Sequence, residues 1–185
     1  MTAKQEKKDK SFPLLAHDNP LRRLFSPPEK LTGPYVVKGL VVADLGCGPG
    51  FYTLALAEGV GPEGKVYAVD IQERSIRKLE KKAAKRGFHN IEAHASSATD
   101  LGFIKDGSVD FILAHGLLCS MAPHHHDPAV AEMLRILKPQ GRAYLSAAKG
   151  SWSYVDRAEW ERILGRFSVE KNGEGGDFWG VVSPK

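Results

Sequence analysis

The chain of 185 residues has few cysteines and lacks a long apolar run. Neither Cys47 nor Cys119 belongs to a Cys-x-x-Cys motif, so the sequence offers no disulfide framework and no paired-thiol metal site. No apolar segment follows the N-terminal lysines, and none approaches the length needed to span a membrane. These absences lead us to expect a reduced, cytoplasmic protein outside the membrane.

A strong charge of one sign is also missing. Lysine and arginine number 26 against 22 aspartates and glutamates, a formal net charge of +4. Much of the positive charge lies in two separate runs, "KQEKKDK" and "RKLEKKAAKR", the second being typical of the solvated face of a helix. Nucleic acid is therefore an alternative partner that the charge pattern does not favour. Nothing in the sequence indicates an oligomeric state.

From Leu40 onward, short apolar runs alternate with segments of helical periodicity. We expect strands over residues 40–45, 64–71, 90–95, 109–116 and 141–148, and helices over 51–60, 72–87, 127–138 and 156–167. The helix at 127 should begin with Asp127 as its N-cap. A closing hairpin is expected over 168–172 and 177–183, because the glycine-rich "GEGG" separates two strand-like runs. This order predicts an α/β, Rossmann-like, doubly wound sheet, mostly parallel, with helices on both faces and antiparallel character at one edge.

The stretch "VVADLGCGPGFYT" places Gly46, Gly48 and Gly50 between the first strand and the first helix. In a doubly wound sheet, ligands bind at this carboxyl edge of the strands. Phe51 stands where a dinucleotide-binding loop has its third glycine, which disfavours a nicotinamide-dependent oxidoreductase. Asp70 ends the second strand, and its carboxylate can accept hydrogen bonds from both ribose hydroxyls of an adenosine.

Four segments, "VVADLGCGPGFYT", "VYAVDI", "VDFILAHGLL" and "MLRILKPQGRAYLS", together resemble the class I S-adenosylmethionine-dependent methyltransferases. They occur in that family's order, and the similarity runs from about Leu40 to the C-terminus. The resemblance implies a seven-stranded sheet with an antiparallel last strand. It also implies S-adenosylmethionine as methyl donor, with S-adenosylhomocysteine as product.

The resemblance also suggests a set of cofactor-binding positions at the carboxyl ends of the strands. These are Asp44, Gly46, Cys47, Gly48, Gly50, Asp70, Ile71, Ser97, Ala98, Ala114 and His115. Asp70 would hold the ribose and Ile71 would flank the adenine. Ser97 stands where the family commonly has an acidic residue that reads the adenine edge, and Asp100 is a candidate substitute.

Methyl transfer depends mainly on the alignment of donor and acceptor, and a base is needed only if the acceptor must lose a proton. The sequence therefore indicates no catalytic residue beyond a candidate, His115, at the end of the fourth strand. Candidate walls for an acceptor pocket are Tyr35, Phe51, Tyr52, Trp152 and Trp160, of which Trp160 has the helical spacing of a core residue.

Three adjacent histidines, His124 to His126, occur in "MAPHHHDP". Adjacent side chains on a loop diverge, so we predict an exposed loop ahead of a helix rather than a metal site, with acceptor contact as an alternative. Cys119 is expected to be a small buried residue.

We divide the chain into a disordered tail (1–11), an N-terminal helical lid (12–36) and a methyltransferase domain (37–185). In the lid, Asn19 and "PPEKL" suggest two helix starts, and related enzymes often cover the acceptor with such a segment. The favoured function is methylation of a small molecule. An RNA or protein methyltransferase and a non-catalytic S-adenosylmethionine-binding protein are the alternatives, although no "DPPY"-type or "NPPY"-type motif follows the fourth strand.

Overall fold

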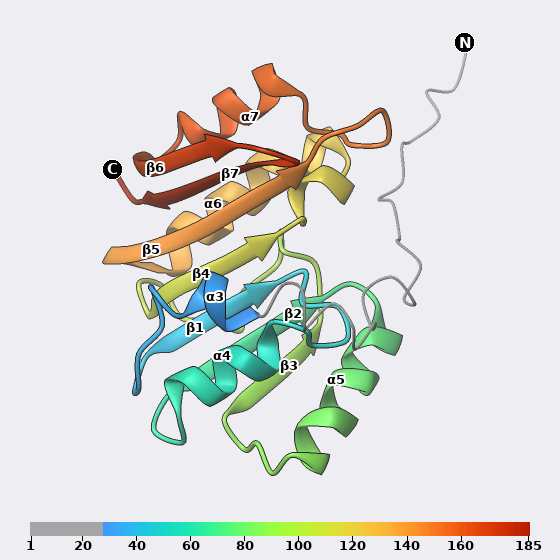
Figure 1. The fold of residues 1–185 in the computed structure, drawn as a ribbon, viewed down its shortest axis with the longest axis vertical. Helices are drawn as coiled ribbons and strands as arrows, with labels where there is room; N and C mark the ends of the chain where they lie inside the picture. Colours follow the sequence, from blue (N-terminus) through green and yellow to red (C-terminus); the bar gives the residue numbers. More distant parts are fainter. Residues whose placement is uncertain (1–27) are drawn as a thin grey trace.

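The computed structural model describes residues 28–185, which form a seven-stranded sheet with helices on both faces (Figure 1). The strands are β1 (Val41–Leu45), β2 (Lys65–Asp70), β3 (Ile91–Ala95), β4 (Val109–His115), β5 (Leu137–Ala148), β6 (Ser168–Glu174) and β7 (Asp177–Ser183). The helices are α3 (Pro28–Thr32), α4 (Thr53–Val60), α5 (Glu73–Lys85), α6 (His126–Ile136) and α7 (Arg157–Leu164), with short 3₁₀ helices η1 (Leu118–Ser120) and η2 (Pro123–His125).

The sheet has the order β3-β2-β1-β4-β5-β7-β6, and only the pairs that involve β7 are antiparallel. The predicted fold is therefore confirmed, including the antiparallel strand near one edge. The chain runs outward from β1 through β2 to β3 and then returns to β4 on the other side of β1. This reversal makes the carboxyl ends of β1 and β4 the switch point at which such sheets bind ligands.

Successive side chains of the central strands point to opposite faces of the sheet and contribute to two hydrophobic layers. On one face, Val42 and Phe111 pack with Val60 of α4, while Leu79 of α5 belongs to an adjoining cluster. On the other face, Ile112 and Leu145 pack with residues of α6 and α7. Since β1 and β4 are buried on both sides, their near-continuous apolar sequences are those of interior parallel strands.

The predicted start of the helix after the histidine run is wrong. Helix α6 begins at His126, and its N-cap residue, His125, makes no side-chain capping bond. Asp127 instead forms ion pairs with Arg162 (2.8 Å) and Arg166 (3.1 Å), because α7 packs beside α6 and carries Arg162, and Arg166 follows just after α7. By contrast, α7 is capped at Asp156, whose side chain accepts a hydrogen bond from the Glu159 amide.

Only part of the predicted lid can be compared with the structure. The helix expected at Asn19, the tail 1–11 and residues 12–27 lie outside the described residues. The start predicted at "PPEKL" is α3, after which Tyr35 stacks on Phe111 with ring centroids 5.4 Å apart. Within residues 28–185, no helix has the length and apolar character required to cross a membrane.

Candidate functional site

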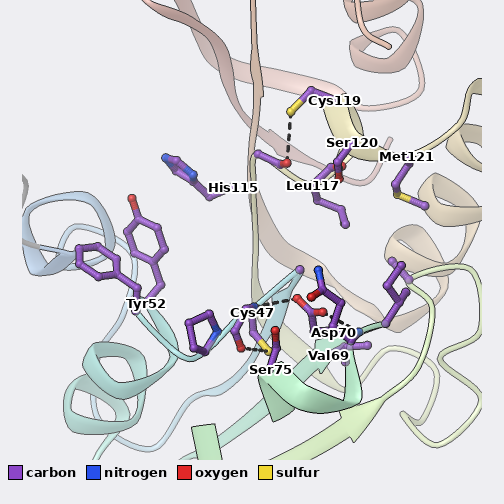
Figure 2. Close-up of a pocket in the computed structure, with 18 of the residues that line it drawn as sticks. Cys47, Tyr52, Val69, Asp70, Ser75, His115, Leu117, Cys119, Ser120 and Met121 are labelled. Carbon is purple, nitrogen blue, oxygen red and sulfur yellow. Dashed lines mark hydrogen bonds between the residues drawn. The ribbon is translucent and has the colours of Figure 1, made fainter. Parts of the chain in front are cut away.

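A cavity of about 340 Å³ lies along the carboxyl edge of the parallel strands. Its walls come from the β1–α4 loop, the end of β2, the segment after β3, the loop after β4, the end of β5 and the start of β7. Figure 2 shows Asp70 near the base of this cavity, with Tyr52 and His115 on one side and Ser120 and Met121 on the other. Its volume lies within the range of small-molecule sites.

The three glycines of the β1–α4 loop have different roles. All have positive φ angles, of 77°, 52° and 89° for Gly46, Gly48 and Gly50, a conformation that side chains rarely adopt. A Cβ on Gly46 would lie 3.1 Å from Leu117, and one on Gly50 would lie 2.4 Å from Leu79 of α5. A Cβ on Gly48 would meet nothing within 4 Å, and Gly48 itself borders the cavity. Gly48 therefore keeps the backbone open to a ligand, whereas Gly50 permits packing.

Asp70 joins the glycine loop to the end of β2. Its Oδ2 accepts a 2.8 Å hydrogen bond from the Gly48 amide, and its Oδ1 accepts one of the same length from the Gln72 amide. An ionised carboxylate has about four acceptor positions. Two positions are left for a ligand, which fits a pair of ribose hydroxyls.

The wall next to Asp70 combines an apolar surface with small polar groups. Ile71 is 56% exposed although it is apolar, and it borders the cavity together with Ser97 and Ala98. The Ser97 hydroxyl lies 2.8 Å from that of Thr99. Asp100, the candidate substitute for the missing acid, is not among the residues that line the cavity.

Asp44 lies beneath the site and does not border the cavity. Its Oδ2 accepts a 2.6 Å hydrogen bond from Thr53 in the first turn of α4. Burial raises the pKa of Asp44 to about 7, the Thr53 hydroxyl opposes this shift, and the charge of Asp70 adds to it. Burial also raises the pKa of the Cys47 thiol well above its usual value, so Cys47 offers no thiolate at neutral pH.

A row of aromatic rings begins at the cavity with Tyr52 and His115 and continues beyond it to Tyr144 and Trp179. The ring of Tyr52 lies 4.9 Å from that of His115, which lies 6.4 Å from Tyr144, which in turn lies 6.4 Å from Trp179. Phe51 extends the row with an edge contact of 5.0 Å to Tyr52. His115, Tyr144 and Trp179 come from the adjacent strands β4, β5 and β7, and Phe51 and Tyr52 come from the loop before α4, so only the fold brings these rings together.

The loop after β4 is anchored by the third histidine of the run. His126 is fully buried, with Nε2 lying 3.0 Å from the Leu118 carbonyl oxygen and 3.1 Å from that of Met121. Its Nδ1 lies 2.6 Å from Glu159 Oε1 on α7. The prediction of an exposed loop is therefore wrong for His126, because its ring fills the space between two helices and η1. Within residues 28–185, no group of three or more metal-binding side chains is placed to hold an ion.

Eight of the eleven predicted cofactor-binding residues border the cavity, and three do not. The eight are Gly46, Cys47, Gly48, Asp70, Ile71, Ser97, Ala98 and His115. Asp44, Gly50 and Ala114 lie behind this wall. Phe51, Tyr52 and Trp152 also border the cavity, whereas Tyr35 and Trp160 pack with the core. Cys119 is buried, as predicted, and also borders the cavity.

Sequence reasoning missed two groups of residues near the site. Tyr144 and Trp179 lie within strands. The alternation of side chains along a strand predicts which face of the sheet a residue is on, but it does not predict which other strands lie beside it. Asp177 borders the cavity at the start of β7, and its position at a strand end was the one available signal.

Comparisons with known proteins agree with this geometry. The sequence model of a family described as a methyltransferase domain matches residues 37–163. Demethylmenaquinone methyltransferases of Geobacillus stearothermophilus and Listeria monocytogenes serotype 4a are 39% and 33% identical over 106 and 107 residues, 57% and 58% of this chain. These alignments cover 44% of each relative, so the chain matches less than half the length of those proteins.

Solved structures align over nearly the whole chain. A SAM-dependent methyltransferase from Aquifex aeolicus is 26% identical, with a TM-score of 0.75 over 93% of this chain and 98% of that one. A protein from Pyrococcus horikoshii OT3 is 21% identical, with a TM-score of 0.77 over 95% of this chain and 100% of that one, and shows the same fold.

Proposed function

Since the chain belongs to the class I S-adenosylmethionine-dependent methyltransferases, we propose that it transfers a methyl group from S-adenosylmethionine to a small-molecule acceptor. The observation that carries this proposal is the pairing of Gly48 with Asp70. An open backbone position and a carboxylate with spare acceptor capacity lie next to each other, as an adenosine with an attached chain requires.

The residues of the cavity suggest how the cofactor is held. Asp70 accepts hydrogen bonds from the ribose hydroxyls, and Ile71 packs against one face of the adenine. Ser97 and Ala98 approach the adenine edge, and the methionine part lies along Gly46 and Gly48. Asp44 does not contact the cofactor directly. Its hydrogen bond from Thr53 fixes the start of α4 and thereby the position of the glycine loop.

When bound, S-adenosylmethionine supplies a methyl group on a positively charged sulfur. The chain's own contribution is alignment and the exclusion of water from the acceptor side. His115 borders the cavity between Tyr52 and Tyr144, and it is the candidate group to take a proton from an acceptor that must lose one.

Two observations support a small acceptor. The first is charge: no lysine or arginine of residues 28–185 borders the cavity, whereas sites for nucleic acid depend on contacts between such residues and phosphates. The second is the naming of the curated relatives as demethylmenaquinone methyltransferases.

Calorimetric titration with S-adenosylhomocysteine tests the cofactor assignment, with NAD as the control ligand. We expect a dissociation constant on the order of micromolar for S-adenosylhomocysteine and no heat of binding for NAD. Binding of NAD alone would contradict the proposal. A screen with radiolabelled S-adenosylmethionine then tests transfer, and methylation confined to RNA or protein would contradict the small acceptor.

A further inference from the structure

One carboxylate of the cavity has no assigned role. Asp177 is the first residue of β7, is partly buried, and pairs in the sheet with Ala148 at the end of β5. Within the described part of the chain, its side chain makes no hydrogen bond or ion pair, although its backbone carbonyl accepts one from Gly175. A carboxylate without a partner has acceptor positions open to a ligand with a positive charge or donor groups.

Asp177 lies at the opposite end of the cavity from the ribose position. The strands that border the cavity follow the order β2, β1, β4, β5 and β7, and Asp70 ends the first while Asp177 begins the last. Neighbouring strands are about 4.8 Å apart, so four intervals separate these carboxylates by about 19 Å along the sheet edge. If Asp70 holds the ribose and the methionine part passes over β1 and β4, the acceptor lies over β5 and β7.

Aromatic side chains border the cavity, and others lie next to Asp177 on the sheet. Trp179 lies two residues after Asp177 and therefore on the same face of β7, and it continues the row of Tyr144, His115 and Tyr52. Trp152 borders the cavity near the end of β5. Flat apolar faces next to a carboxylate are a combination that binds organic cations.

The neighbours of Asp177 respond to its charge. Burial is the main cause that raises the pKa of the Tyr144 phenol to about 12 and raises the pKa of the Cys119 thiol, and the charge of Asp177 adds a smaller contribution to each. Both groups therefore stay protonated at neutral pH and add no negative charge. The charged side chains that border the cavity within residues 28–185 are Asp70 and Asp177, together with the titratable His115.

We propose that Asp177 is a specificity-determining residue that selects a small aromatic amine as the acceptor, with the ammonium group paired to its carboxylate and the ring against Tyr52, His115 and Trp152, which border the cavity. This inference rests on the proposed function, because it assigns the acceptor end of the same site.

The test compares two probes that differ in the ammonium group, tyramine and 4-ethylphenol, on protein saturated with S-adenosylhomocysteine. Affinities are measured by ligand-observed NMR titration. We expect tyramine to bind about tenfold more tightly, which is a moderate value for a carboxylate–ammonium pair assisted by aromatic rings. In Asp177→Asn, this preference should disappear while both probes still bind.

Glu63→Gln is the matched control, since it removes one exposed carboxylate in the turn before β2 and should keep the preference. Thermal melting of both variants checks the fold, which should survive because the Asp177 side chain has no partner among the described residues. Equal affinities of the two probes in the wild type, no binding of either, or an undiminished preference in Asp177→Asn would each overturn the inference. If S-adenosylhomocysteine binds, any of these results contradicts only the role of Asp177 and not the proposed function. If S-adenosylhomocysteine does not bind, both the proposed function and the role of Asp177 are contradicted.

Discussion

The Gly48 amide donates a 2.8 Å hydrogen bond to the carboxylate of Asp70 across 22 positions of sequence. This bond joins the loop after β1 to the end of β2, so the two parts of the candidate cofactor site hold each other in place. Lys82 of α5 adds a 3.1 Å hydrogen bond to the Pro49 carbonyl of the same loop. The loop is therefore ordered by its neighbours and can present an open backbone without a ligand.

Replacement of Asp70 should remove cofactor binding without unfolding the protein. In Asp70→Asn, the amide nitrogen would face either a backbone N–H or the ribose hydroxyls, and the negative charge is lost. Charge-assisted hydrogen bonds contribute about 1.5–3 kcal/mol each, so the affinity for S-adenosylhomocysteine should fall by about 100-fold or more. Calorimetry measures the loss, and circular dichroism monitors the fold. An unchanged affinity would refute the ribose assignment.

Alanine at Gly48 and at Gly50 should produce different defects. Both carry the strain of positive φ, about 1 kcal/mol. Gly48→Ala should mainly weaken binding of S-adenosylhomocysteine, because Gly48 borders the cavity. Gly50→Ala should lose a further 1–3 kcal/mol or so of stability, because its Cβ overlaps the buried Leu79. Urea unfolding and calorimetry separate the two effects, and identical profiles would contradict the division of roles.

The raised pKa of Asp44 predicts a loss of stability with increasing pH. Because the folded state holds the Asp44 proton up to about pH 7 and the unfolded state releases it near 3.8, the free energy of unfolding falls between these values. The fall is at most about 4 kcal/mol, at 1.36 kcal/mol per pH unit. Asp44→Asn keeps an acceptor for Thr53 and cannot ionise. It should therefore be more stable than the wild type at pH 8 but not at pH 4, as urea unfolding at several pH values will show.

Glu159 predicts the opposite dependence on pH. Hydrogen bonds from Arg162, and secondarily from His126, lower the pKa of Glu159 to about 2. The ionised Glu159 carboxylate therefore contributes fully to the free energy of unfolding above about pH 4.5, and this contribution is lost as the pH falls towards 2. Glu159→Gln should cost about 2 kcal/mol at pH 7, and the difference from wild type should shrink below pH 4.5.

Glu170→Gln is the control for Glu159, because Glu170 also pairs with an arginine, Arg142, but on an exposed edge strand. Its cost should be below about 1 kcal/mol. If the two variants lose similar stability at pH 7, His126 and Glu159 do not form the anchor of the loop after β4.

Removal of residues 1–27 tests the lid prediction. The later part of the predicted lid belongs to the core, since Thr32 and Val36 are buried, so the deletion must end before α3. We expect S-adenosylhomocysteine to bind as before and methyl transfer to an acceptor found by screening to become slower. Equal losses of cofactor affinity and turnover would count against a lid over the acceptor.

Local sequence patterns were sufficient to predict the strands, the final hairpin and two residues of the candidate site. Apolar runs between helical segments determined the parallel strands, and the glycines around Gly175 determined the final hairpin, because both depend on neighbouring residues. Gly48 and Asp70 were recognisable for a similar reason. Asp70 ends β2 and Gly48 lies in the loop just after β1, and the strand ends of a parallel sheet meet at one edge.

Tertiary packing decided what local patterns could not. Gly48 and Gly50 have the same kind of backbone conformation, and only the position of Leu79 separates their roles. His126 looks like part of a polar loop until α7 brings Glu159 against it. Asp177 reaches the cavity because β7 inserts between β5 and β6, and such a contact depends on strand order, which no short segment of sequence encodes.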